Sequence, residues 1–214
     1  MPIEDALAAV LSDTRTFGQL LIQPRSAGGF FVCHREDQNK PALKVFLKPE
    51  DAIEIARYDD AGKYRPLKTA PNLRHGWRLD VVDRGELRRA LDHFYPGRLG
   101  VLASWKANDL TATTLRETLA RQSGMYRVAS NISDEQADHV VANFCRSDGG
   151  CLRAILWKRD ESGAPPSTRL PLIKFDPAHD QTGLGQRSIP LLCQEACNLL
   201  VNECRKAVKA ETSG

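Results

Sequence analysis

The segment "SIPLLCQEACNLLVNECRKAV", residues 188–208, places three of the chain's six cysteines in one run of helical character. Upstream, "NFCRSDGGCLRAILW", residues 143–157, supplies two more, Cys145 and Cys151. In a reducing compartment, cysteines gathered in this way more often bind a metal or carry out redox chemistry than form disulfides. The pattern therefore predicts a metal centre in the C-terminal part of an intracellular chain.

The composition fits a cytoplasmic globular protein. The 214 residues are 42% hydrophobic and 27% charged, which is ordinary for such proteins and leaves room for a core that needs no disulfide. The net charge of +3 disfavours a dedicated nucleic-acid-binding protein, and no apolar run is long enough to span a membrane. Glu4 and Asp5 stand where a signal peptide would carry basic residues, so we expect a cytoplasmic location.

Residues 1–125 carry the pattern of an α+β domain. Apolar runs bounded by turn signals predict strands, and amphipathic runs ended by glycine or proline predict helices. The second of these helices has an apolar stripe of Leu87, Leu91 and Phe94. The expected strands are 17–24, 30–36, 42–46 and 76–82, and the expected helices are 48–62 and 83–97.

Residues 126–214 are expected to form a second, mostly helical domain that holds the cysteines. A helix over 133–145 begins with Ser133 and Gln136, which are spaced as in a capping box, and ends at Cys145. The last helix is expected to start near Pro190, because proline is tolerated in a first turn. A further helix is expected at 108–124, next to the approximate domain boundary near residue 125. A strand is expected at 169–175, and loops are expected at 158–168 and 176–188. Residues 151–157 form an apolar segment of uncertain type.

The spacing of the cysteines selects four candidate ligands. On a helix, Cys193 and Cys197 would share one face about 6 Å apart along the axis, whereas Cys204 would lie roughly 10.5 Å further on. One small centre reaches all three with difficulty, so the expected ligands are Cys193 and Cys197 together with Cys145 and Cys151. Cys204 and the distant Cys33 are expected to be small apolar residues packed in cores.

Four thiolates suit either a structural zinc ion or an iron–sulfur cluster. Zinc modules usually present cysteine pairs separated by two to four residues, whereas five residues with a Gly-Gly turn separate Cys145 from Cys151. Apolar residues also flank the cysteines, and a dry surrounding stabilises a cluster. The start of the last helix would direct backbone N–H groups at a negatively charged cluster. The spacing favours a cluster and leaves both zinc and metal-free thiols as alternatives.

Longer phrases of the sequence resemble the iron–sulfur region appended to long sirohydrochlorin cobaltochelatases. These phrases are "LRETLARQSGMYRVASNISDEQADHVVANFC", "GGCLRAILW" and "IPLLCQEACNLL". The upstream phrases "DDAGKYRPLKTAPNLRHGWRL" and "LDHFYPGRLG" resemble the stabilising domain that accompanies that region. Together the resemblance covers most of residues 15–205.

The resemblance implies a [4Fe-4S] cluster held at the positions of Cys145, Cys151, Cys193 and Cys197. The chelatase domain of that family begins with a strand that runs into a Gly-His-Gly type turn, and none of the five histidines here stands in such a context. The resemblance therefore implies an accessory, structural or redox protein of tetrapyrrole metallation, in the cobalamin or siroheme pathway, whose partner is a separately encoded chelatase. It assigns no catalytic residue.

A basic stretch over 63–78 is the other feature with binding potential. Its side chains suit the carboxylates of a tetrapyrrole or the phosphates of a nucleic acid, although an ordinary solvated surface is the simpler interpretation. The alternative function is therefore a nucleic-acid-binding protein without catalytic activity, in which zinc or a cluster has only a structural role. No motif for hydrolysis or nucleotide binding is present. The residues of the stretch are Arg65, Lys68, Arg74, His75 and Arg78 around Tyr64 and Trp77.

Overall fold

The computed structural model divides the chain into two compact units. One unit comprises Met1–Leu110 and Thr182–Leu191, and the other comprises Thr111–Gln181 and Leu192–Gly214. This division places residues 111–125 in the second unit, whereas the sequence pattern predicts them in the first. The structure describes residues 2–11, 15–58, 62, 73–107, 109–110, 113–145, 153–157, 188–189 and 191–211.

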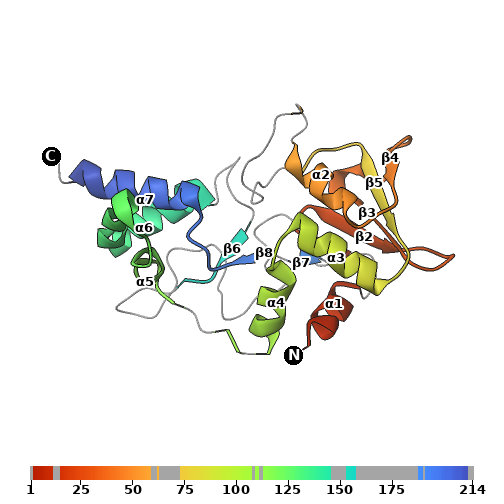
Figure 1. Ribbon diagram of the computed structural model, residues 1–214, viewed down its shortest axis with the longest axis horizontal. Helices are drawn as coiled ribbons and strands as arrows, with labels where there is room; N and C mark the ends of the chain where they lie inside the picture. The colour runs from red at the N-terminus through yellow and green to blue at the C-terminus, as the bar shows by residue number, and fades with distance from the viewer. Residues whose placement is uncertain are drawn as a thin grey trace. The chain divides into compact units, whose positions relative to one another are not determined.

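A six-stranded mixed sheet forms the first unit (Figure 1). The strand order is β4-β5-β3-β2-β1-β7. The central strands β5, β3, β2 and β1 pair with one another in antiparallel fashion, whereas the edge strands β4 and β7 are parallel to β5 and β1 respectively. The strands are β1 (Arg15–Phe17), β2 (Leu20–Pro24), β3 (Phe30–His34), β4 (Lys44–Phe46), β5 (Trp77–Val81) and β7 (Ser188–Ile189).

Four helices complete the first unit. They are α1 (Ile3–Leu11), α2 (Asp51–Arg57), α3 (Arg84–Phe94) and α4 (Arg98–Lys106), of which α1 and α4 were not predicted. The stripe predicted on α3 is confirmed, since Leu87, Leu91 and Phe94 are buried. Trp77 of β5 stacks on Phe94 with ring centroids 5.1 Å apart, which joins the helix to the sheet. The mixture of helices and a mixed sheet confirms the α+β class.

The strand predicted at 17–24 is a hairpin. Gly18 has a φ of 60° and opens a two-residue turn with Gln19, so that Phe17 of β1 lies opposite Leu20 of β2. Glycine at the first turn position with positive φ is typical of type II′ turns. A Cβ atom at Gly18 would also lie 2.8 Å from Leu191 Cδ1. The continuous apolar run hides this turn, because one glycine is its only signal.

The second unit is mostly helical. It contains α5 (Leu115–Leu119), a 3-10 helix η2 (Gly124–Asn131), α6 (Asp134–Val140), a π-helical turn η3 (Val141–Cys145) and α7 (Asn198–Glu211). Strand β6 (Arg153–Ile155) pairs with β8 (Leu191–Cys193) in a small separate sheet. The capping box predicted at Ser133 is confirmed, because its hydroxyl and the Gln136 side chain exchange bonds with the two backbone N–H groups. The strand and loops predicted within 158–187 lie outside the described residues.

Two helix predictions in this unit are wrong in extent. The helix predicted over 108–124 is only α5, which begins after a capping box formed by Thr114 and Glu117. The helix predicted from Pro190 begins at Asn198, so Cys193 and Cys197 do not share a helix face. The cause is tertiary: residues 191–193 join the β6–β8 sheet, where the Leu156 amide donates to the Cys193 carbonyl at 2.9 Å.

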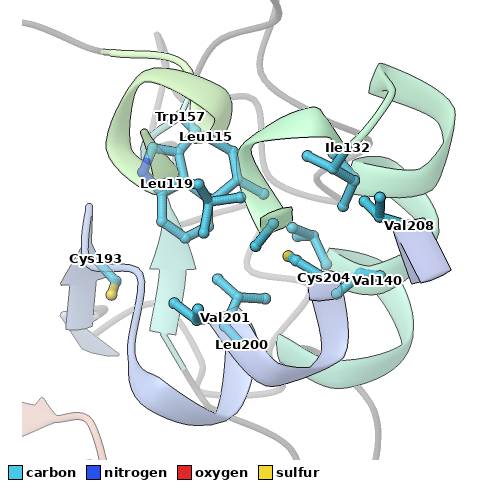
Figure 2. Packing of buried hydrophobic residues seen from close by; sticks show 13 residues of the cluster. Leu115, Leu119, Ile132, Val140, Trp157, Cys193, Leu200, Val201, Cys204 and Val208 are labelled. Carbon is cyan, nitrogen blue, oxygen red and sulfur yellow. The ribbon is translucent and has the colours of Figure 1, made fainter. Parts of the chain in front are cut away.

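The core of the second unit gathers apolar side chains from α5, η2, α6 and α7, with Trp157 at one side next to Leu115 and Leu119 (Figure 2). The Cys204 side chain lies inside this cluster, near Val140 and Val201 in Figure 2, whereas Cys193 lies at its edge. Trp157 is fully buried and donates its indole N–H to the Gln194 carbonyl at 3.2 Å. The segment that carries Cys193 is thereby tied to β6 by both a ladder bond and a side-chain bond.

Among the described residues, no helix is long and apolar enough to cross a membrane.

Candidate metal centre

Cys193 ends strand β8 as a buried side chain, 5% exposed. Its Sγ accepts a hydrogen bond from the backbone N–H of Glu195 at 3.4 Å. The chain then continues through residues 194–197 without regular structure, so the two sulfur-bearing residues lie on an irregular connection between a strand and a helix. Such a connection leaves backbone amides available for the sulfur atoms.

Cys197 occupies the N-cap position of α7. Its carbonyl accepts the first helical bond, from Val201 at 2.9 Å, and its Sγ accepts the N–H of Leu200 at 3.5 Å. That amide is one of the donors that a helix start leaves without an intrahelical partner. The sulfur therefore takes the place of the serine or aspartate oxygen that usually caps a helix, at the end where the helix dipole favours negative charge.

The two sulfur atoms thus share an environment suited to an anionic centre. Each accepts one backbone N–H, and hydrogen bonds to sulfur stabilise the reduced, more negative state of an iron–sulfur cluster. At the start of the last helix the Leu200 N–H donates to the Cys197 sulfur, and the helix starts eight residues later than Pro190. Neither residue forms a disulfide within the described part of the chain.

The other pair of candidate ligands is described only in part. The backbone of Cys145 ends η3, directly after α6, as the sequence predicts. Cys151 lies outside the described residues and precedes Arg153, the first residue of β6, by two positions. Because β6 pairs with β8, the strand that follows Cys151 lies beside the strand that ends in Cys193. The described contact to Cys193 lies at the end of β6 farther from Cys151 in sequence, where the Leu156 amide donates to the Cys193 carbonyl.

The remaining two cysteines are packed thiols, as predicted. Cys204 is fully buried in the core of the second unit, and burial raises the pKa of its thiol to about 12. Cys33, on β3 of the first unit, is 1% exposed, and burial together with the nearby Asp37 charge raises its pKa to about 11. Metal binding requires the thiolate, so both environments oppose a ligand role.

The basic stretch is largely neutralised where it is described. Arg78 donates two hydrogen bonds to Asp80, at 2.8 and 3.0 Å, and Arg74 pairs with Glu54 at 3.5 Å. Trp77 is buried in the core of the first unit rather than presented to a ligand. Tyr64, Arg65 and Lys68 lie outside the described residues. Nothing described here forms an open cationic patch for phosphates.

A second group of ligand-type side chains was missed by sequence reasoning. His34, Glu36 and His75 each offer one ligand atom, and these atoms lie within 4.8 Å of one another. His34 and His75 are far apart in the sequence, yet their ring centroids lie 3.9 Å apart. The pairing of β3 with β5 brings them together. The local pattern His-x-Glu was the only signal in the sequence.

Two family models match adjoining parts of the chain. Residues 4–109 match the DR2241 stabilising domain, and residues 107–206 match a 4Fe-4S iron-sulfur cluster binding domain. The resemblance drawn from the sequence is confirmed. The second match contains all four candidate ligands. No curated protein matches the chain.

A solved structure supports the same relationship. The DR2241 protein of Deinococcus radiodurans is described as a multi-domain protein with structural similarity to chelatases and two additional novel domains. It superposes with a TM-score of 0.74 at 26% identity over 97% of this chain. The chain spans 41% of the length of that protein, so the fold and the two matched domains are shared over less than half of the relative.

Proposed function

We propose that this protein binds one [4Fe-4S] cluster through Cys145, Cys151, Cys193 and Cys197. The match of residues 107–206 to a 4Fe-4S cluster binding domain carries the proposal. The amides that donate to the sulfur atoms of Cys193 and Cys197 support it, because a cluster with four thiolate ligands is an anion. The donor set would supply four thiolates, and the cluster would contribute either structural cross-linking or one-electron chemistry.

The chain's own residues would prepare the site in two ways. The β6–β8 pairing would hold β8 in place, with Leu156 beside Cys193, and the N-cap of α7 would fix the Cys197 sulfur. Trp157, buried behind this segment, would keep water from one side of it. A cluster in this position would link the end of η3, the start of β6 and the start of α7.

The proposed role is an accessory of tetrapyrrole metallation, in the cobalamin or siroheme pathway, that works with a chelatase. The support is the shared fold with a protein described as similar to chelatases. Sirohydrochlorin is the tetrapyrrole that the family resemblance indicates. The alternative of a nucleic-acid-binding protein gains nothing from the described arginines of the basic stretch, since these pair with carboxylates.

Anaerobic purification of the full chain tests the cluster. The protein should be brown, absorb broadly near 400 nm and contain about four irons and four sulfides per chain. Serine at Cys193 or Cys197 should remove most of the iron, because a hydroxyl is a poor replacement for a thiolate. A colourless protein with one zinc ion per chain would contradict the cluster proposal and support the zinc alternative.

The accessory role needs a separate experiment. Cluster-loaded protein is titrated with sirohydrochlorin, and is also applied with a sirohydrochlorin chelatase to a size-exclusion column. A spectral change of the tetrapyrrole or co-elution with the chelatase supports the role. If neither occurs while the cluster is intact, the role in metallation is wrong and the cluster assignment still stands.

A further inference from the structure

The first unit contains a compact polar group at the end of strand β3. His34 is the last residue of β3, Glu36 lies in the short 3-10 helix η1 (Arg35–Asp37) that follows, and His75 lies two residues before β5. Because Cys33 pairs with Arg78 across β3 and β5, the ends of these neighbouring strands bring the two imidazoles together. The group therefore rests on sheet register rather than on a loose loop.

His34 has an unsatisfied buried atom. The side chain is 1% exposed, and its Nε2 has no hydrogen-bond partner within the described part of the chain. Its Nδ1 faces the Glu36 N–H at 3.3 Å, which is long for a hydrogen bond. A buried nitrogen without a partner is costly and calls for a missing water or ion.

His75 is oriented as metal-binding histidines usually are. Its Nδ1 lies 3.1 Å from Oδ1 of Asp37, a fully buried carboxylate, and its Nε2 lies 3.8 Å from Oε2 of Glu36. A ligating histidine commonly donates one ring N–H to a carboxylate and binds the metal through the other nitrogen. Asp37 is held in turn by the Gly76 amide at 2.6 Å and by Lys40 at 2.7 Å.

We propose that His34, Glu36 and His75 form a binding site for a divalent transition metal ion of the zinc type. Two imidazoles and one carboxylate are a donor set that zinc accepts, with the fourth position left for water. Asp37 is the positioning residue that fixes His75. Glu36 is 61% and His75 30% exposed, so solvent reaches the group from their side. Ligation by His34 Nε2 places the ring proton on Nδ1 and gives up the long contact with the Glu36 amide.

Zinc titration of the full-length, cluster-loaded protein by calorimetry under anaerobic conditions tests the site. We expect one zinc ion per chain, bound at least about 10-fold more weakly by E36Q and by H75Q, since even partners of the ligands change metal affinity by that factor. Two matched controls, E50Q and H93Q, should bind as the unchanged protein does. The exposed fraction of Glu50, 59%, is similar to the 61% of Glu36. His93 lies on α3, outside the group.

Each result decides the proposal. No uptake of zinc, or equal affinity in all four variants, overturns it, and the latter outcome would point to the cysteines. Circular dichroism checks that E36Q, at an exposed position, and H75Q, at a half-buried one, are folded. The site lies in the first unit and does not rest on the proposed cluster, so an iron-free protein that still binds zinc through these residues would separate the two hypotheses.

Discussion

Replacement of Cys204 by serine separates the packed thiol from the proposed ligands. The Cys204 side chain is packed among apolar neighbours, and its solvent-exposed fraction is 0%. Burial raises the thiol pKa to about 12, so the group is neutral at pH 7 to 8. The change should therefore reduce the stability of the second unit and leave the iron in place.

The expected magnitude follows from the burial of a hydroxyl. A buried polar group without a good partner costs about 1–3 kcal/mol, and a serine in a helix can donate to a carbonyl one turn earlier, which moves the cost toward about 1–2 kcal/mol. For a domain of 60–100 residues, each 1 kcal/mol lowers the Tm by about 4–8 °C. We expect the melting temperature to fall by roughly 5–15 °C.

The assay combines two measurements on the same anaerobic sample. Iron and sulfide analysis gives the cluster content, and thermal unfolding followed by circular dichroism gives the Tm. Cys33→Ser in the first unit is the matched control, since that thiol is equally buried on a strand far in sequence from the cysteine cluster. Loss of most of the iron on substitution of Cys204 would refute the reasoning and make Cys204 a ligand.

Three further changes address the fold. Burial and the nearby charge of His75 lower the pKa of His34 to about 4 from 6.5. The free energy of unfolding is therefore highest above pH 6.5 and falls by on the order of 3 kcal/mol as the pH drops toward 4. Urea unfolding midpoints measured across this pH range check the prediction. Ser133→Ala should cost about 1 kcal/mol through loss of its bond to the Gln136 amide, measured by urea unfolding. Gly18→Ala should cost about 1–2 kcal/mol or more, measured in the same way, because φ is 60° and a Cβ would touch Leu191.

Each of these changes has its own control. The pH effect should flatten in H34N, and an unchanged slope between pH 6.5 and 4 would contradict the assignment to His34. Ser130→Ala removes a hydroxyl that donates only to the Arg127 carbonyl outside any capping box, so equal losses at Ser130 and Ser133 would argue against the cap. Gly28 has a positive φ but no atom within 4 Å of an added Cβ, so G28A should cost less than G18A.

Local patterns in the sequence predicted the elements whose signals are local. The stripe on α3 and the capping box at Ser133 depend on residues within one or two turns, and both occur as expected. The hairpin at Gly18 was missed because one glycine is its only local signal, and the strand β8 was missed because it depends on β6, a partner far away in the sequence. Apolar runs such as that around Leu191 fit a helix or a strand equally well, and only the pairing decides.

The candidate sites also divide into residues predicted from local spacing and residues that only strand pairing brings together. Cys193 and Cys197 were found from spacing, yet the stated reason, a shared helix face, was wrong because the helix begins at Asn198. The prediction that Cys204 is not a ligand was also based on that helix. The burial of the Cys204 side chain supports this prediction independently. The group around His34 and His75 was not predicted, since strand register and not sequence distance brings these residues together.

The short strand β7 ties the backbone that precedes Cys193 to the sheet of the first unit. Ser188 and Ile189 pair with β1 inside the first unit, and Cys193 follows Ile189 by only four residues. The backbone that delivers one proposed ligand is thus anchored upstream by a sheet built mainly from the first hundred residues. A fragment from residue 111 onward would keep every clustered cysteine but lose that anchor, so it would assemble iron poorly even though no ligand had been removed.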